Sequence, residues 1–408
     1  MNPELRFKDQ DGNEFPDWEE KKLKNICIFV NGKGHEQVIS QYGKYIVVNS
    51  KFVSTDGEIV KYSNEQLEPL FKDDIVMVMS DVPNGRAIAK FFYIDEDNKY
   101  SLNQRICAIR TNQNQMFIMK QLNRHKYFLA FDDGAKQTNL KKEDVLKCPV
   151  FIPDMKEQSK IATLLSDIDK KIESQVTLVE KLKNTKDAML VKMFPQGESK
   201  VPEIRFDGFS GDWEVKKLGS VAEFIKDGTH ASYKDSKVGY PLLSAKDIYN
   251  NEIHIPADCR IISEEDYKSI FKSYNLENND ILLTIVGTIG RIAIYKIAMP
   301  QVAFQRSVAI IRPKKIYDAK FISQYMSIYY FQSELLKRQN KGAQGGIYLG
   351  SLSKILVKIP SKKEEQEKIG QFFSNLDKEI EINQQKYEKL CDVKKALLSK
   401  LFPTKEDE

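Results

Sequence analysis

The chain has 408 residues, of which 41% are hydrophobic and 30% are charged, and its formal net charge is +5 at pH 7. This length exceeds that of one ordinary core and predicts two or three folded domains. The small positive charge is compatible with a nucleic-acid partner but does not by itself indicate one. The sequence has no run of about 18 apolar residues and no apolar signal segment near its N-terminus, so we expect a cytoplasmic protein without a membrane span.

Motifs of common catalytic and metal centres are missing from the sequence. It contains no P-loop, no G-x-S-x-G elbow and no Asn/Asp-Pro-Pro-aromatic signature, and its four histidines lack the spacing of metal ligands. The cysteines are odd in number and scattered, which predicts reduced thiols with neither a disulfide framework nor a zinc site (Cys27, Cys107, Cys148, Cys259, Cys391). We therefore expect no catalytic residue, no metal and no bound cofactor, although a nuclease can carry dispersed carboxylates that no motif reveals.

The sequence repeats itself with a period of about 200 residues, too long for a solenoid. The segment 3–7 returns as 202–206, and Asp17-Trp18-Glu19 returns as Asp212-Trp213-Glu214, so the only two tryptophans occupy equivalent places. Residues 157–195 align even better with 365–403. The repeat predicts the tandem duplication of a whole domain together with the tail that follows it.

The first globular segment, about 17–150, contains short runs of β-branched and apolar residues at 45–48, 75–79 and 106–109, with turn residues between them. Such runs are typical of strands in a mixed α/β domain. The second globular segment, about 212–357, has the same pattern, with runs at 281–285 and 308–311. We thus expect two α/β domains of one fold.

A long helix is expected after each globular segment. Asp154-x-x-Glu157 and Ser361-x-x-Glu364 have the form of capping boxes, and Phe194-Pro195 and Phe402-Pro403 mark the ends. Apolar positions alternate by four and three, as in a coiled coil, and each helix should be ~60 Å long at 1.5 Å per residue. The seam residues are Ile161, Leu165, Ile168, Ile172, Gln175, Val179 and Leu182 in the first helix, and Ile369, Phe373, Leu376, Ile380, Asn383, Tyr387 and Leu390 in the second.

Polar residues interrupt both seams at the same repeat position, where Gln175 and Asn383 stand. If the two helices pair in antiparallel fashion, these two amides meet, and a buried amide pair fixes register at some cost in stability. The alternative is that both amides are merely tolerated at a loosely packed point. The expected architecture is α+β: two tandem domains and an antiparallel helix pair with pseudo-two-fold symmetry.

Corresponding loops of the two domains carry basic and amide side chains beside glycines. Such side chains can approach phosphates or read base edges, although each loop can equally be a turn with a solvated charge, and the histidines can be ordinary hydrogen-bonding residues. The candidate DNA-binding residues are Lys33, His35, Lys51, Arg86, Gln104, Arg105, Lys136 and Gln137 in the first half, and His230, Tyr233, Lys234, Lys246, Thr288, Arg291, Gln305, Arg306, Lys341 and Gln344 in the second.

The order of these features resembles the specificity subunit of type I restriction–modification enzymes over essentially the whole chain. The resemblance rests on the Gly287-Thr288-Ile289-Gly290-Arg291 loop, on the Gln-Arg pairs before a strand, and above all on a motif found in both helices. That motif is Ile-Pro, then Glu157-Gln158, Lys160-Ile161 and 165–169, and it returns as Glu365-Gln366, Lys368-Ile369 and 373–377. The first half departs from the loop pattern at 82–85, which puts the role of that loop in doubt.

The resemblance implies two target recognition domains that read unlike parts of a split double-stranded DNA site. It implies spacer helices that bind two modification subunits, which methylate adenine using S-adenosylmethionine, and restriction subunits that use ATP and Mg²⁺. The expected organisation is recognition domain 1 at 1–150, a central helix at 151–196, recognition domain 2 at 197–357, a C-terminal helix at 358–403 and a tail at 404–408. Two other classes stay open: a nuclease or methyltransferase with an unrecognised centre, and a coiled-coil adaptor that binds only proteins.

Overall fold

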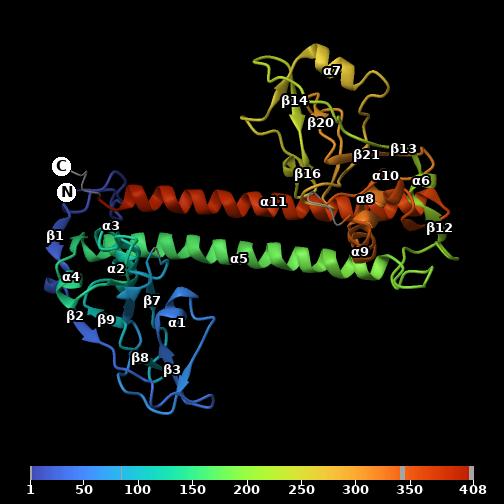
Figure 1. Cartoon of the computed structure of the whole chain (residues 1–408). Helices are drawn as coiled ribbons and strands as arrows, with labels where there is room; N and C mark the ends of the chain where they lie inside the picture. Colours follow the sequence, from blue (N-terminus) through green and yellow to red (C-terminus); the bar gives the residue numbers. More distant parts are fainter. Residues whose placement is uncertain (1, 84, 341–344, 404–408) are drawn as a thin grey trace. The chain divides into compact units, whose positions relative to one another are not determined.

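The computed structural model describes residues 2–83, 85–340 and 345–403, which form two compact units. Unit 1 comprises residues 1–176 and 386–408, and unit 2 comprises residues 177–385. Each unit contains one α/β domain and parts of two long helices, α5 (Met155–Met193) and α11 (Lys363–Leu401) (Figure 1). The expected mixed fold with two tandem domains is confirmed.

The domain of unit 1 is built on a four-stranded antiparallel sheet with the strand order β2-β9-β5-β7. A smaller sheet, β4-β3-β8, pairs β3 with β8 in parallel. The elements of this domain are β1 (Glu19–Lys22), η1 (Leu23–Asn25), β2 (Cys27–Asn31), β3 (Tyr45–Val48), α1 (Ser50–Ser54), β4 (Tyr62–Ser63), β5 (Ile75–Val78), β6 (Ser80–Asp81), β7 (Phe91–Tyr93), β8 (Tyr100–Leu102), β9 (Ile106–Thr111), α2 (Gln115–Leu122), α3 (Lys126–Leu129), β10 (Thr138–Asn139), α4 (Lys142–Leu146) and β11 (Pro149–Ile152).

The domain of unit 2 repeats this topology, with sheets β13-β21-β18-β19 and β17-β14-β20. Here β14 is the strand that pairs in parallel, with β20. The elements are β12 (Glu214–Lys217), α6 (Leu218–Val221), β13 (Ala222–Asp227), β14 (Tyr240–Leu243), η2 (Ala245–Asp247), β15 (Ile248–Tyr249), β16 (Glu252–Ile253), β17 (Ile261–Ile262), α7 (Glu264–Ile270), β18 (Ile281–Thr284), β19 (Ile292–Ile294), β20 (Ala303–Phe304), β21 (Val308–Pro313), α8 (Ala319–Ser327), α9 (Tyr329–Lys337), α10 (Leu349–Leu352) and β22 (Leu356–Ile359).

Both faces of each main sheet are covered, because alternate side chains of a strand point to opposite faces. In β5, Ile75 and Met77 pack with helix α2 and the start of α5, whereas Val76 and Val78 pack against the small sheet. In β18, Ile281 and Leu283 face the helices while Leu282 faces the small sheet. In each unit the small sheet therefore lies on the side of the main sheet away from the long helices (Figure 1).

Both repeats contain the same joint between the domain and the long helix that follows it. The first strand of the domain pairs with its last strand (β1 with β11, and β12 with β22). The Glu157 carboxylate then accepts hydrogen bonds from Arg6 Nη2 (2.7 Å) and Trp18 Nε1 (3.2 Å), and the Glu365 carboxylate accepts from Arg205 Nε (2.7 Å). These contacts hold the start of the helix against the start of its own repeat.

The capping-box interpretation is therefore wrong for Glu157. Asp154 does cap α5, since its carboxylate accepts from the Lys156 N–H at 2.8 Å. Glu157, however, is fully buried, and Arg6 and Trp18 occupy both of its carboxylate oxygens. The neighbouring Gln158 forms a second link between the helix and the domain: its side-chain amide accepts from the Asn114 N–H (3.0 Å) and donates to the Pro153 carbonyl (2.9 Å).

Within each unit the two long helices run antiparallel and exchange equivalent ion pairs. In unit 1 Lys394 Nζ of α11 lies 2.6 Å from the Asp169 carboxylate of α5. In unit 2 Lys186 Nζ of α5 lies 2.5 Å from the Asp377 carboxylate of α11. Asp169 and Asp377 occupy one repeat position, and Lys186 and Lys394 occupy another, so each unit contains the same contact with the helices exchanged.

The end of each long helix enters a domain core. Phe194 follows α5 and packs in the core of unit 2 edge-to-face with Trp213, tilted against Phe321 and stacked on Phe373. Phe402 follows α11 and packs against Trp18 and Phe117 in unit 1. All of the seam residues named from the sequence are buried or partly buried. Among the described residues, no helix is long and apolar enough to cross a bilayer.

Candidate nucleic-acid interface

In unit 1 the loop after β2 crosses the loop between β8 and β9, and Gly32 allows the two backbones to touch; we call this contact the glycine crossing. After β2 the chain passes directly over the loop between β8 and β9, and a Cβ on Gly32 would lie 2.0 Å from the Asn103 carbonyl oxygen. The Gly32 N–H donates to Ile106 O (3.2 Å) and the Lys33 N–H donates to Leu102 O (3.0 Å). Any side chain at position 32 would push the two loops apart, so this crossing requires glycine.

The crossing gathers four candidate residues from three separate loops. Lys33 lies in the loop that follows β2, and Gln104 and Arg105 lie in the loop between β8 and β9. The third loop joins because the Asn103 N–H donates to Val48 O (3.2 Å), which places the start of α1 and Lys51 beside them. All four side chains are exposed, so they can reach a ligand outside the domain (Lys33, Lys51, Gln104, Arg105).

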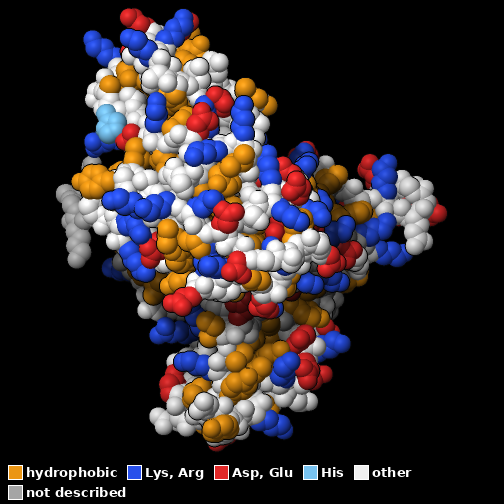
Figure 2. Space-filling model, turned by 90° about the vertical axis from the view of Figure 1, so that its right-hand side faces the viewer, with side chains coloured by type: hydrophobic (Ala, Val, Ile, Leu, Met, Phe, Trp, Pro, Cys, Tyr) orange, Lys and Arg blue, Asp and Glu red, His pale blue; other side chains and the backbone are white. Residues whose placement is uncertain are grey.

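Two carboxylates moderate the positive charge at this crossing. Lys33 Nζ lies 3.0 Å from the Glu68 carboxylate and also donates to Leu67 O. Gln104 Nε2 donates to Glu36 Oε1 at 2.8 Å. Figure 2 likewise shows basic and acidic side chains mixed over the face that it draws. The site is therefore a set of directed polar groups and not a uniform basic field.

Unit 2 builds the same crossing with different side chains. A Cβ on Gly228 would lie 2.1 Å from the Phe304 carbonyl oxygen. The Thr229 N–H donates to Phe304 O (2.8 Å), and the Arg306 N–H donates back to Thr229 O (3.0 Å). The Ala245 N–H donates to Ser307 Oγ (3.0 Å), which brings in Lys246. Lys246 and Arg306 are exposed and Gln305 is partly exposed.

The next two loops of unit 1 adjoin this crossing. The Met79 N–H donates to Arg105 O (3.0 Å), and the Leu140 N–H donates to Met79 O (2.8 Å). Gln137 Nε2 donates to Ser80 Oγ (2.7 Å), which fixes the loop that carries Lys136. Arg86 and Lys136 are exposed. Hydrogen bonds thus connect the loops that carry Lys33, Lys51 and Lys136 to the segment that carries Gln104 and Arg105, directly or through Met79 and Ser80.

In unit 2 the corresponding loop is anchored differently. Arg291 is partly buried, and its Nη1 donates to Ile248 O (3.1 Å) beside a hollow of about 300 Å³. Thr288, three residues earlier, is exposed. Arg291 therefore supports the β15–β16 hairpin as well as facing outward. Lys341 and Gln344, also named from the sequence, lie outside the described residues.

The two candidate histidines are in unlike surroundings. His35 is only 2% exposed, and its ring nitrogens lie 2.8 Å from Lys33 O and 2.7 Å from Ser101 Oγ. His35 thus stabilises the crossing from inside the domain and is too buried to contact DNA, contrary to the prediction from the sequence. His230 is exposed, with Nε2 2.6 Å from the Asp227 carboxylate. Tyr233 bonds Thr229 Oγ1 through its hydroxyl (2.9 Å), and Lys234 is exposed.

The described residues do not assemble groups of catalytic type. No cluster of three or more His, Cys, Asp or Glu that could hold a metal ion occurs in the described ranges. Burial raises the pKa of Cys27 to about 11 and that of Cys148 to about 12, so these thiols stay protonated and unreactive at neutral pH. Burial also raises the pKa of Cys107.

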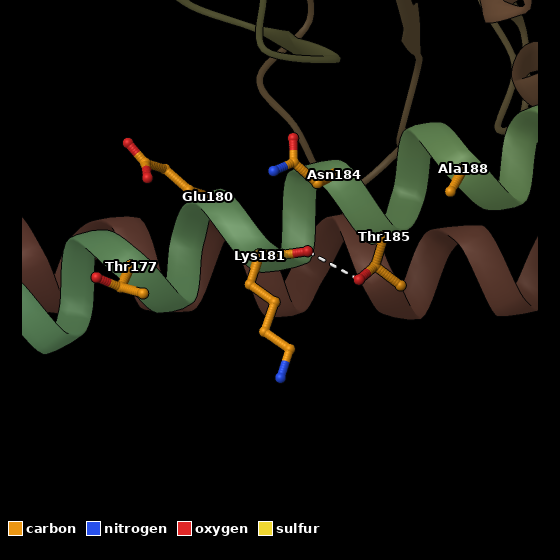
Figure 3. A pocket seen from close by; sticks show the side chains of 6 residues that line it. All are labelled: Thr177, Glu180, Lys181, Asn184, Thr185 and Ala188. Carbon is orange, nitrogen blue, oxygen red and sulfur yellow. Dashed lines mark hydrogen bonds between the residues drawn. The ribbon is translucent and has the colours of Figure 1, made fainter.

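A further hollow of about 430 Å³ runs along α5 in unit 2. Six exposed residues of this one helix line it, and their side chains diverge from the helix instead of converging on a point (Thr177, Glu180, Lys181, Asn184, Thr185, Ala188) (Figure 3). Ligand pockets usually enclose their ligand with convergent polar groups. This hollow is therefore a surface groove.

The contacts of Arg6 with Glu157 and of Arg205 with Glu365 were not predicted. Their partners are far apart in sequence, so no local motif connects them. The repeat contained the relevant signal, because Arg6 and Arg205 are equivalent and so are the two glutamates. The pair of Glu and Gln in the helix motif is thus explained by the joint between helix and domain.

Comparison with known proteins agrees with this geometry. The family model described as "Type I restriction modification DNA specificity domain" matches residues 16–184 and 210–391. The type I restriction enzyme MjaVIII specificity subunit of Methanocaldococcus jannaschii is 24% identical, over 98% of this chain and 96% of that protein.

Two solved structures share the fold. The S subunit of a type I restriction–modification system from M. genitalium has a TM-score of 0.66 at 17% identity, with complete coverage of both chains. A chain from a study of complex assembly and conformational transition of the type I R-M system has a TM-score of 0.52 at 14% identity, covering 96% of this chain and all of that one. With one family model matching both halves and most of its length, this chain belongs to the family of type I restriction–modification DNA specificity subunits.

Proposed function

We propose that this chain is the DNA-reading subunit of a type I restriction–modification complex, in which each domain reads one part of a split site. The observation that carries the proposal is the glycine-built crossing, which occurs once in each domain and presents exposed basic and amide side chains in both. Arginine and glutamine beside each other suit base edges, and lysines suit phosphates.

The two parts of the site are unlike. Lys33 of unit 1 corresponds to Thr229 of unit 2, and the two Gln-Arg pairs are one residue out of register, because Lys33 pairs with Asn103 where Thr229 pairs with Gln305. The β15–β16 hairpin of unit 2 stands where unit 1 has helix α1 and the chain that leads to β4. Different side chains on one scaffold favour an asymmetric, bipartite site, and half-sites about one helical turn (~34 Å) apart could both be reached from one side of the duplex.

The chemistry belongs to partner subunits in this proposal. Two modification subunits, carrying S-adenosylmethionine, dock on the helices and the adjoining joints, and restriction subunits with ATP and Mg²⁺ join them. The reciprocal ion pairs support two docking positions of the same kind, because equivalent residues surround both. The chain itself supplies recognition and spacing, which is what specificity subunits of the family contribute.

The test is sequence-selective DNA binding by the chain assembled with its modification subunit, measured against competitor DNA at stated salt. We expect enrichment of a split sequence from randomised duplexes, and no turnover by the chain alone with S-adenosylmethionine or Mg²⁺. Turnover by the chain alone would instead indicate an enzyme. Assembly without any selective DNA binding would indicate a protein adaptor.

A further inference from the structure

A second feature is repeated in both domains, away from the glycine crossing. Just before β3 the chain makes the turn Ser40-Gln41-Tyr42-Gly43, and just before β14 it makes the turn Ser236-Lys237-Val238-Gly239. Each serine accepts the N–H of the residue two positions later, from Tyr42 at 3.3 Å and from Val238 at 3.4 Å. The two turns thus share the Ser-x-apolar-Gly pattern and its serine contact, although only the first closes with a bond from the Gly43 N–H to Ser40 O (3.2 Å).

Each turn is pinned to the neighbouring strand, so its tip cannot fold inward. The Ser40 N–H donates to Tyr62 O (3.0 Å) of β4, and the Ser236 N–H donates to Ile261 O (2.8 Å) of β17. A Cβ on Gly43 would lie 2.4 Å from the Ser63 backbone, and one on Gly239 would lie 1.9 Å from Ile262 O. The close approach of these glycines holds both turns rigidly on the small sheets.

The tip residues are large, apolar and almost wholly exposed. Tyr42 is 91% exposed and Val238 is 83% exposed. Single exposed apolar residues are common on proteins, and one such residue needs no explanation. Here two exposed apolar residues occupy the same position of a duplicated turn, and neither contributes to the stability of its domain by burial. Their repetition therefore points to contact with a partner.

The surroundings of the tips favour DNA as that partner. Lys44 lies two residues after the first tip, and Lys61 directly precedes β4, the strand to which that turn is pinned. Lys234 and Lys237 lie four residues and one residue before the second tip. All four lysines are exposed, and the nearby carboxylate of Asp235 is engaged by Arg260 Nε at 2.6 Å. An apolar tip between cations fits a duplex groove, where lysines meet phosphates and an apolar side chain meets thymine methyl groups or wedges between bases.

We propose that the two Ser-x-apolar-Gly turns are specificity-determining contacts, at which Tyr42 and Val238 each place an apolar side chain against the bases of their own half-site. This inference rests on the proposed DNA-reading function. Because one tip is aromatic and the other aliphatic, the turns also contribute to the difference between the half-sites.

The experiment enriches randomised duplexes on the full chain assembled with its modification subunit, and compares sequence profiles. Tyr42→Ala should lower the preference at one or two positions of the first half-site by about tenfold, the usual cost of a lost base contact, and leave the second half-site unchanged. Val238→Ser should do the converse. Tyr42→Phe and Val238→Ile keep the apolar contact and should retain the wild-type profile.

Matched controls separate this effect from the loss of any exposed apolar residue. Tyr329 on α9 is 86% exposed and Ile297 is 71% exposed, and neither lies in a Ser-x-apolar-Gly turn. Tyr329→Ala and Ile297→Ser should leave both half-site profiles unchanged. Duplexes with uracil in place of thymine would distinguish a methyl contact from a wedge, since only the former depends on the methyl group.

Three results would overturn the inference: unchanged profiles in Tyr42→Ala and Val238→Ser, equal weakening for all sequences, or loss of assembly while DNA selectivity persists. The last would make the tips protein contacts. A failure of the proposed function is distinguishable, because then the wild-type assembly itself would enrich no sequence.

Discussion

The two domains are most alike where they join the long helices and least alike where they face outward. The joints share the Arg6–Glu157 and Arg205–Glu365 contacts and the helix-end aromatics. The outward loops share two backbone features, the glycine crossing and the Ser-x-apolar-Gly turn, and carry different side chains on both. The two halves therefore share the scaffold and the backbone of the loops, while the side chains that these loops expose differ.

Even the joints differ, in two respects that can be measured. In unit 1 Trp18 Nε1 donates to Glu157, whereas in unit 2 Trp213 Nε1 is buried and has no hydrogen-bond partner among the described residues. In unit 1 Lys120 and Lys394 both engage Asp169, whereas in unit 2 Gln324 takes the place of Lys120 beside Asp377.

The largest effect is expected for a carboxylate placed in the helix seam. Ile168 is 8% exposed, and Ile168→Asp buries an unpaired charge, which should lower the free energy of unfolding of unit 1 by roughly 4 kcal/mol. Leu376→Asp, at the same repeat position, should cost less because Leu376 is only partly buried. Denaturant unfolding and binding of the modification subunit should be measured for both variants. Wild-type stability and binding in both would contradict the pairing of α5 with α11.

The next effect is the loss of a buried ion pair at the joint. Glu157→Gln removes the charge that faces Arg6 and should destabilise unit 1 by about 3 kcal/mol, because the partly buried arginine keeps only the exposed Asp17, 3.8 Å away, as a counter-ion. Glu365→Gln should cost unit 2 less, since Glu365 lacks the bond from tryptophan. Hydrogen exchange resolved by segment measures each unit, with the exposed Glu364→Gln as the control. A larger loss of stability from Glu365→Gln in unit 2 than from Glu157→Gln in unit 1 would contradict this prediction.

A smaller effect, about 1–3 kcal/mol in DNA binding, is expected at the crossings. Arg105→Ala should weaken recognition of the first half-site and Arg306→Ala that of the second. A base contact relaxes one position, whereas a phosphate contact weakens all sequences and reduces the salt slope by about one. Lys24→Ala, exposed in the last turn of η1, is the control. If neither arginine matters, the crossings are not the reading site.

The smallest effect is a dependence on pH in unit 1. Burial alone would raise the pKa of Asp169, but hydrogen bonds from Lys120 and Lys394 outweigh it and the net pKa is lowered. A lowered folded-state pKa means that this stability is present above the unfolded value, about 3.9, and is lost as the pH falls through the folded value. Unfolding of wild type and Asp169→Asn from about pH 6 to pH 3 should converge at the acid end. Parallel curves would show that the pair contributes nothing.

Much of the scaffold could be predicted from the sequence because local patterns determine it. Strand β3 begins and ends where the apolar run 45–48 does, and α5 ends at Met193, directly before Phe194-Pro195. The antiparallel pairing within each unit also agrees with the seams. What the sequence could not reveal are contacts over long separations. Glu157 has the spacing of a local cap but pairs with Arg6, 151 residues away.

The candidate site was less predictable for the same reason. The crossing puts His35 inside, between Lys33 O and Ser101 Oγ, although a histidine between glycine and glutamate reads as an exposed loop residue. Arg291 similarly bonds the carbonyl of Ile248, 43 residues earlier. The position of a loop side chain depends on which loop crosses it, and only the folded chain determines that.

The central claim is that each half is a complete scaffold with its own reader, and a fragment ending near Gln196 tests it most directly. In a homodimer of this fragment, Lys186 of one copy would take the place of Lys394 beside Asp169 of the other, and Phe194 would take the place of Phe402 beside Trp18. The fragment loses the high effective concentration of the intact chain, so dimerisation should require higher protein concentration. Assembled with modification subunits, it should methylate adenines in an inverted repeat of the first half-site. Methylation at the two unlike halves of the intact chain's site, or a fragment that stays monomeric at high concentration, would contradict the account.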